Sequence, residues 1–492
     1  MVKKSNGNVV HRGPINSLGP DGSFANETGQ RSNTRDDEEP HSLLTQTEIL
    51  NACDSVSYRS CSVSVLLVMI VALALLTWLR YPLKSGVTGT LELGICAAVV
   101  SFMAFGSNYL PDSQLVRPHP VFWRLVLASA VLYLVALSFL LPQNLESLRK
   151  MFLAYDPSLT RLPEERGYAE DCRISTSEDM FYFMRTTFDV FIFAHISGYF
   201  VKTIIVRDWR LVTCMSISFE IVEVSLQHLL PNFKECWWDH ILLDIVVCNG
   251  AGTLLGVLVL RMFSAREYDW MKCRNVKGRY AYPMKFILHF LPRCFVEYEW
   301  NVFLNRKRFL QCCMLLSLFT LNELNTFTLK HMLRIPSKHF LVFGRLVLWG
   351  LLAIPAVCEY YIYISGHDSK KKLGPFAWVS LADLFLEVVL VVKLATEGGY
   401  FTEPAPLHIA LPLRASFLFF IIWFSLYFSA LTLRKRQEKK CAMYIISNVF
   451  FYSGCACVLG MFAMGLPDLQ IFRTTFESFV NSHEHLFSLL LW

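Results

Sequence analysis

The sequence predicts an all-α membrane protein, a polytopic bundle with about ten transmembrane helices. Hydrophobic residues make up 54% of the 492 residues, and charged residues make up only 17%. The apolar residues gather in stretches of membrane-spanning length, and the basic residues gather between them. This composition excludes an ordinary soluble protein. The net charge is +6, and the basic residues cluster in loops beside the apolar segments, as is usual in membrane proteins. This distribution argues against nucleic-acid binding.

The apolar stretches divide the chain into three parts. Residues 1–60 are polar and predict a disordered cytosolic tail. Residues 61–433 predict a transmembrane catalytic bundle, and residues 434–492 a basic linker with an additional hydrophobic segment at 443–466. That segment fits an eleventh span or a re-entrant segment. The ten predicted spans are 62–79, 90–106, 122–142, 187–206, 211–230, 240–262, 309–329, 339–364, 375–394 and 408–433.

The basic loops predict an orientation for these spans. Lys and Arg prefer the cytoplasmic side, and the strongest basic cluster lies in residues 261–308. If that loop is cytosolic, alternation places the N-terminus in the cytosol and residues 143–186 and 231–239 on the lumenal side. Cys172 and Cys236 then share an oxidising compartment, which suggests a disulfide between them. Two free thiols are the alternative.

Acidic residues are unusually dense in the apolar stretch 219–249. Each carboxylate at the centre of a membrane helix costs about 2.5 to 3.5 kcal/mol on insertion scales. A buried hydrogen-bond network that ties helices together is one explanation. The other is a site for a hard divalent cation, Ca²⁺ or Mg²⁺, for which carboxylate oxygens are better suited than for zinc. The acids concerned are Glu220 and Glu223 on one helix face, and Glu235, Asp239 and Asp244 beyond the turn.

The motifs of several common enzyme classes are missing, including those of enzymes driven by a nucleotide. The sequence has no Walker loop, GxSxG elbow, HExxH pair or GxGxxG fingerprint. Its one Asp-Gly pair, Asp21-Gly22, lies in the tail, so the DG-x2-AR pattern of CDP-alcohol phosphotransferases is absent too. His195 lies one span before the acidic face. A histidine there could act as a base or a nucleophile, and the alternative is a hydrogen bond between helices.

Several motifs that the sequence does contain together resemble those of animal phosphatidylserine synthases. The resemblance runs from about residue 117 to 393 and depends on Leu230-Pro231-Asn232-Phe233-x-Glu235-Cys236-Trp237-Trp238-Asp239, on His195, on Glu220-x-x-Glu223, on Cys248-Asn249-Gly250 and on Glu323-Leu324-Asn325-Thr326-Phe327. The string at 207–210, RDWR, is closer to the form that prefers phosphatidylethanolamine. The C-terminus departs from the family, whose members typically end in a polar tail.

The resemblance implies a base-exchange enzyme of the endoplasmic reticulum. In such an enzyme L-serine replaces the head group of phosphatidylethanolamine or phosphatidylcholine, with Ca²⁺ required and no nucleotide consumed. Whether histidine acts as base or forms a phosphohistidine stays open, as does a homodimer. The implied roles are catalysis for His195 and Glu220, Ca²⁺ binding for Glu223, Glu235, Asp239 and Asp244, substrate binding for Asn232 and Asn249, and regulation or lipid-phosphate contact for Arg117 and Arg345.

A membrane transporter is the alternative function. In a cation-coupled transporter the same intramembrane acids would form an ion path. Such proteins often show inverted repeats, and no such symmetry is visible in this sequence. The enzyme is therefore the favoured prediction.

Overall fold

A computed structural model gives the structure of the chain. Contacts divide it into two units, Met1–Ser64 and Val65–Trp492. The predicted tail, 1–60, lies outside the described residues. The structure describes residues 61–80, 87–115, 119–160, 172, 190–236, 238–264, 298–365, 372–435, 442–465 and 470–482.

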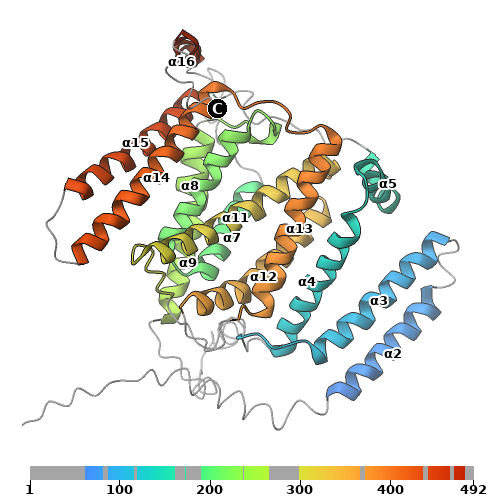
Figure 1. Ribbon diagram of the computed structural model, residues 1–492. Helices are drawn as coiled ribbons and strands as arrows, with labels where there is room; N and C mark the ends of the chain where they lie inside the picture. Colours follow the sequence, from blue (N-terminus) through green and yellow to red (C-terminus); the bar gives the residue numbers. More distant parts are fainter. Residues whose placement is uncertain are drawn as a thin grey trace, which may run out of the picture. The chain divides into compact units, whose positions relative to one another are not determined.

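Every regular element in these ranges is a helix, which confirms the predicted fold class (Figure 1). The longer helices are α2 (Cys61–Arg80), α3 (Val87–Tyr109), α4 (Pro120–Leu140), α5 (Leu145–Tyr155), α7 (Val190–Val206), α8 (Trp209–Leu226), α9 (Asn249–Ser264), α11 (Arg306–Leu333), α12 (Phe340–Ser365), α13 (Pro375–Gly398), α14 (Leu407–Lys435), α15 (Ala442–Gly465) and α16 (Gln470–Ser482). Three short elements are η1 (Pro157–Thr160), η2 (Pro231–Phe233) and the π-helix η3 (Asp239–Cys248).

Each predicted span coincides with a helix, but the count of about ten is not confirmed. Among the described residues, seven helices are long and apolar enough to cross a membrane. The helix α7 is shorter, at 17 residues. The helix α8 contains Arg210, Glu220 and Glu223, so its polar side chains offset its apolar ones. Both of these helices contribute to the site described below.

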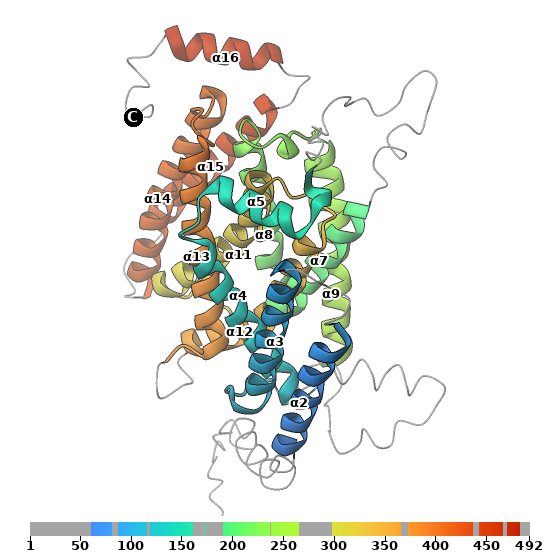
Figure 2. The same cartoon turned by 90° about the vertical axis from the view of Figure 1, so that its right-hand side faces the viewer.

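The three largest apolar clusters hold the central helices together. One joins α7 and α8 to α11 and α12, and includes the buried Met215 and Trp300. A second joins α4, α12 and α13 around Trp123 and Phe376. A third joins α4, α5, α11 and α13 around Leu148. The four helices α4, α11, α12 and α13 therefore form a packed group beside the α7–α9 group (Figures 1 and 2).

The helices α7 and α9 pack very closely because α9 has two glycines four residues apart. A Cβ atom at Gly252 would lie 2.3 Å from the carbonyl oxygen of Ile196 in α7, and one at Gly256 would lie 2.6 Å from Cβ of Thr203. Small residues at this spacing let two membrane helices approach backbone to backbone. This approach places His195, the neighbour of Ile196, beside the start of α9.

The segment between α8 and η3 is braced at its tip. Pro231 prevents α8 from continuing, and Phe233 packs against Phe219 and Phe327. A disulfide joins Cys172 to Cys236 across 64 residues of sequence, which confirms that prediction against the alternative of two free thiols. The segment that contains Glu235 is therefore attached both to the bundle and to the preceding loop.

The additional C-terminal segment forms a helix of the bundle. The helix α15 runs along α14, and both views show them side by side (Figures 1 and 2). Its residues Ile445–Phe462 are apolar and long enough to cross a membrane. A continuous helix of this length favours an eleventh span over a re-entrant segment. The amphipathic helix α16 follows and contacts both α14 and α15.

Candidate functional site

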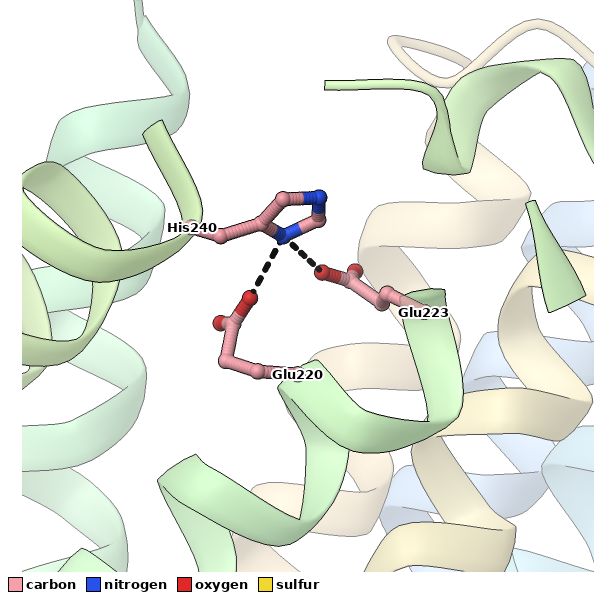
Figure 3. Close-up of side chains that lie close together, drawn as sticks. All are labelled: Glu220, Glu223 and His240. Carbon is pink, nitrogen blue, oxygen red and sulfur yellow. Dashed lines mark hydrogen bonds and ion pairs between the residues drawn. The ribbon is translucent and has the colours of Figure 1, made fainter. Parts of the chain in front are cut away.

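Two glutamates of α8 form the floor of the site. The side chain of Asp208 caps the helix by accepting hydrogen bonds from the backbone amides of Arg210 and Leu211. Glu220 and Glu223 then lie on one face, three residues apart, and both are buried. Figure 3 shows both carboxylates directed at one imidazole ring on the opposite side.

That ring belongs to His240 of η3. Its Nδ1 atom lies 2.8 Å from Oε2 of Glu220 and 3.7 Å from Oε2 of Glu223 (Figure 3). One ligand atom from each of the three side chains lies within 4.8 Å of the others, and all three residues are buried. This is a geometry in which a metal ion could be held.

A third carboxylate approaches the same ring from the braced tip. Oε2 of Glu235 lies 3.7 Å from Nδ1 of His240 and accepts no hydrogen bond in the described part of the chain. Burial, together with the nearby carboxylates of Glu223 and Asp244, raises the pKa of Glu235 well above its usual range. A buried acceptor oxygen without a donor favours a bound cation or proton.

The π-helix places further polar residues near this cluster. In a π-helix the backbone bonds residue i to residue i+5, and the amide of Asn249 donates to the carbonyl of Asp244. Asp239, Asp244 and Asn249 are spaced by five, so they lie closer to one side than they would on an α-helix. Nδ2 of Asn249 donates a 2.9 Å hydrogen bond to Oγ of Ser216 in α8.

His195 of α7 faces this side of the π-helix. Its Nδ1 atom lies 3.5 Å from Oδ1 of Asp244. Its side chain is 38% exposed, against 5% for His240, so part of the ring is accessible from outside the bundle. A partly exposed imidazole beside a carboxylate is suited to accept a proton.

A cationic group lies on the same helix. Lys202 follows His195 by seven residues, which places both on one face of α7. Its Nζ forms an ion pair with Glu323 of α11 and lies 3.9 Å above the ring of Tyr199. The site therefore has an ammonium group two helical turns from the imidazole.

Two of the predicted site residues lie apart from the cluster. Asn232 is half-buried in η2, and its side chain makes no hydrogen bond within the described residues. Arg345 of α12 is bound to Glu387 of α13, with 2.9 Å between Nε and Oε1 and 2.6 Å between Nη2 and Oε2. Arg117 lies outside the described residues. The predicted roles of these three residues stay predictions.

The pair Arg345–Glu387 is the centre of a second polar network. Glu387 is fully buried and also accepts hydrogen bonds from Tyr133, Asn325 and Trp349. Each Glu387 oxygen thus has several donors, and the charge is neutralised within the protein. This network joins α4, α11, α12 and α13, and its contacts are those of a structural ion pair.

His240 is the main residue to which the sequence assigns no role in the site. Its spacing from Asp244 is visible in the sequence, but its contact with three glutamates depends on the turn between α8 and η3. The signal that points to it is its position directly after Asp239 in the acidic stretch. The partners of Lys202 and Arg345 are 121 and 42 residues away, and no local pattern indicates them.

Comparison with known proteins identifies the family. The profile of the family described as Phosphatidyl serine synthase matches residues 118–395. A protein of Oryza sativa subsp. japonica named CDP-diacylglycerol-serine O-phosphatidyltransferase 2 is 36% identical over 394 residues, which cover 77% of this chain and 92% of that protein. Phosphatidylserine synthase 2 of Homo sapiens is 33% identical over 376 residues, which cover 76% of this chain and 75% of the human protein.

These matches cover the helices that form the site, from α4 to most of α13. They agree with the resemblance found in the sequence and favour an enzyme over a transporter. The chain is therefore a multi-pass membrane enzyme of phospholipid biosynthesis. The chain belongs to the phosphatidylserine synthase family.

Proposed function

We propose that this phosphatidylserine synthase works by calcium-dependent base exchange. L-Serine would replace the head group of phosphatidylethanolamine, or of phosphatidylcholine, and release ethanolamine or choline. The observation that supports this is the convergence of Glu220, Glu223 and Glu235 on His240, next to the pair His195–Asp244. Carboxylates that can bind a cation therefore lie beside His195, an imidazole that can accept a proton.

The phosphatidyl donor is the point on which the relatives' names differ. The name of the Oryza sativa protein specifies CDP-diacylglycerol, whereas the name of the human protein specifies no donor. Two features support an existing phospholipid as the donor in this chain. The sequence lacks the DG-x2-AR pattern of CDP-alcohol phosphotransferases. Exchange of one phosphodiester for another also needs no activated nucleotide.

The residues present fit a hard divalent cation. The three glutamates offer carboxylate oxygens, the ligands that Ca²⁺ prefers. Glu235 has a buried oxygen without a hydrogen-bond donor among the described residues, as expected of a ligand position. Asp239 and Asp244 lie next along η3 and would extend the ligand set. A cation bound there would supply positive charge for the phosphoryl oxygens of the donor lipid.

His195, Glu220 and Asn249 would then have separate roles in the reaction. His195, oriented by Asp244, would take the proton from the serine hydroxyl, or would itself attack phosphorus. Glu220 would hold the ring of His240 by accepting its Nδ1 hydrogen. Asn249, held against Ser216, would bind serine or complete the cation's ligands.

The compartment is also a proposal. The disulfide between Cys172 and Cys236 supports an oxidising environment for the tip of the site. With the basic loops in the cytosol, this corresponds to the lumenal side of the endoplasmic reticulum membrane, where Ca²⁺ is available. The N-terminus would then be cytosolic.

The test is incorporation of labelled serine by the purified full chain. Separate micelles would contain phosphatidylethanolamine, phosphatidylcholine or CDP-diacylglycerol, each with Ca²⁺ or with a chelator. We expect Ca²⁺-dependent phosphatidylserine and an equal amount of free ethanolamine or choline. Product formed only from CDP-diacylglycerol, with release of CMP, would overturn base exchange, and product at full rate in chelator would overturn the calcium requirement.

Variants of α7 test the role of His195. His195→Ala should abolish product, whereas Ser197→Ala should not, because the Ser197 hydroxyl is exposed and donates only to the carbonyl of Ala194. Incubation with labelled lipid and no serine separates the two mechanisms. Release of free head group with the phosphatidyl group bound to histidine through an acid-labile phosphorus–nitrogen bond would support the nucleophile, and the absence of this adduct would support the base.

A further inference from the structure

The C-terminal helices lie beyond the residues that the family profile matches. The matched region ends at residue 395, and α14, α15 and α16 follow it. Most of α15 packs along α14, as Figure 1 shows. Its last turns, however, also pack against α8 and contact His240 of η3.

Met461 anchors this end of α15. Its side chain is fully buried between Val224 of α8 and Ile409 of α14. Its sulfur also lies 4.0 Å from the hydroxyl of Ser225, which donates its hydrogen to the carbonyl of Ile221. Val224 and Ser225 directly follow Glu223, so this contact supports the turn of α8 that holds a glutamate of the cluster.

Phe462 contacts the imidazole itself. Its ring meets the ring of His240 nearly edge to face, with the centroids 6.5 Å apart and the planes at 79°. On its other side the same imidazole lies 2.8 Å from Glu220. The aromatic ring therefore restricts the orientation of the histidine that Glu220, Glu223 and Glu235 surround.

The helix α16 contacts α14 and α15 near these residues. Glu477 forms an ion pair of 2.9 Å with His408, which is buried at the start of α14. His408 precedes Ile409, a member of the same cluster as Met461. Val480 of α16 is also buried. Both C-terminal helices thus connect to the residues that support the site.

We propose that α15 is a wall of the active site in this protein, with Phe462 as a positioning residue for His240 and Met461 as its anchor on α8. In this proposal α15 holds the imidazole and the glutamates in the positions that bind the cation. The C-terminal helices therefore set the affinity of the cluster for a divalent ion. The part of this inference that concerns cation affinity rests on the proposed function.

Cation binding to the purified full chain is the first test. Ca²⁺ titrated into Phe462→Ala should bind about 10-fold more weakly than into wild type, because a His240 ring that is no longer held in place is lost as the hydrogen-bond partner of Glu220, and losing such an outer partner of a ligand typically costs about 10-fold or more. Phe462→Tyr keeps the ring and should restore binding. Leu459→Ala is the matched control, because Leu459 is three residues away on α15 and 69% exposed. Serine incorporation by Phe462→Ala should recover at high Ca²⁺, which a misfolded protein would not do.

A second measurement needs no cation. In chelator, diethyl pyrocarbonate should modify His240 faster in Phe462→Ala than in wild type or Leu459→Ala, as followed by peptide mass spectrometry. If wild type binds no Ca²⁺ but this difference is found, the cation proposal fails and the wall remains. Equal modification of His240 in all variants, or wild-type Ca²⁺ affinity in Phe462→Ala, would overturn the inference.

Discussion

Replacing Gly252 by alanine should inactivate the enzyme although Gly252 makes no contact with the carboxylate cluster. The added Cβ would lie 2.3 Å from the carbonyl oxygen of Ile196 and 3.1 Å from the amide nitrogen of Phe200. Both are backbone atoms of α7, so no side-chain rotation can relieve the clash. The helices α7 and α9 must move apart.

The size of that movement can be worked out from the contact. Carbon and oxygen atoms of neighbouring helices approach to about 3.3 Å. The clash at 2.3 Å therefore requires a displacement of about 1 Å. His195 is bonded directly to Ile196 and would move with it, away from Asp244. A misplacement of about 1 Å can reduce a rate by about 100-fold, and overpacking costs about 1 to 3 kcal/mol of folding free energy.

Serine incorporation and thermal unfolding of the purified protein measure both effects. Gly198→Ala is the matched control, because it adds the same methyl group to α7 where no atom lies within 4 Å. We expect Gly252→Ala to lose activity by about 100-fold while Gly198→Ala keeps it. Equal activity in folded samples of the two variants would refute the close packing of α7 and α9 as the device that positions His195.

Three further predictions concern the disulfide, the Arg345–Glu387 pair and Glu235. Cys172→Ser should lower the free energy of unfolding by about 2 to 4 kcal/mol, because the bond to Cys236 closes a loop with a sequence separation of 64; denaturant unfolding checks this. Arg345→Met should cost about 3 to 5 kcal/mol by leaving the Glu387 carboxylate buried and unpaired, and the double variant Arg345→Met/Glu387→Met should recover part of it in a double-mutant cycle. The raised pKa of Glu235 means that its ionisation opposes folding, so the metal-free protein should lose stability as the pH rises through that pKa. A cation bound as proposed would favour the ionised form, so Ca²⁺ should raise the melting temperature more at alkaline than at acidic pH.

Local features of the sequence predicted the helices, the shared face of Glu220 and Glu223, and the disulfide. The length of an apolar stretch depends only on neighbouring residues, so each span could be recognised without knowledge of the others. The spacing of Glu220 and Glu223 placed them on one face because α8 is a regular α-helix. The pairing of Cys172 with Cys236 followed from the topology of charged loops, which depends on composition rather than on packing.

The remaining features depend on geometry that no local pattern encodes. A π-helix from Asp239 to Cys248 changes which residues share a side, and the apolar sequence there is equally typical of an α-helix. The approach of His195 to Asp244 depends on Gly252 letting α7 and α9 come together. The contact between Phe462 and His240 joins positions 222 residues apart in the numbering and needs the path of α14 and α15 to be known.

The two buried acidic networks differ in how their charge is balanced, and this difference separates structure from function. Glu387 has Arg345 as a bidentate partner, together with neutral donors, so its negative charge is neutralised within the bundle. In the described part of the chain, Glu220, Glu223 and Glu235 share only His240 as a basic partner. Three carboxylates around one imidazole leave an excess of negative charge that burial makes expensive. The bundle supplies an arginine for Glu387 but, among the described residues, no arginine or lysine for these three glutamates, and this excess of negative charge is the basis on which we propose a cation there.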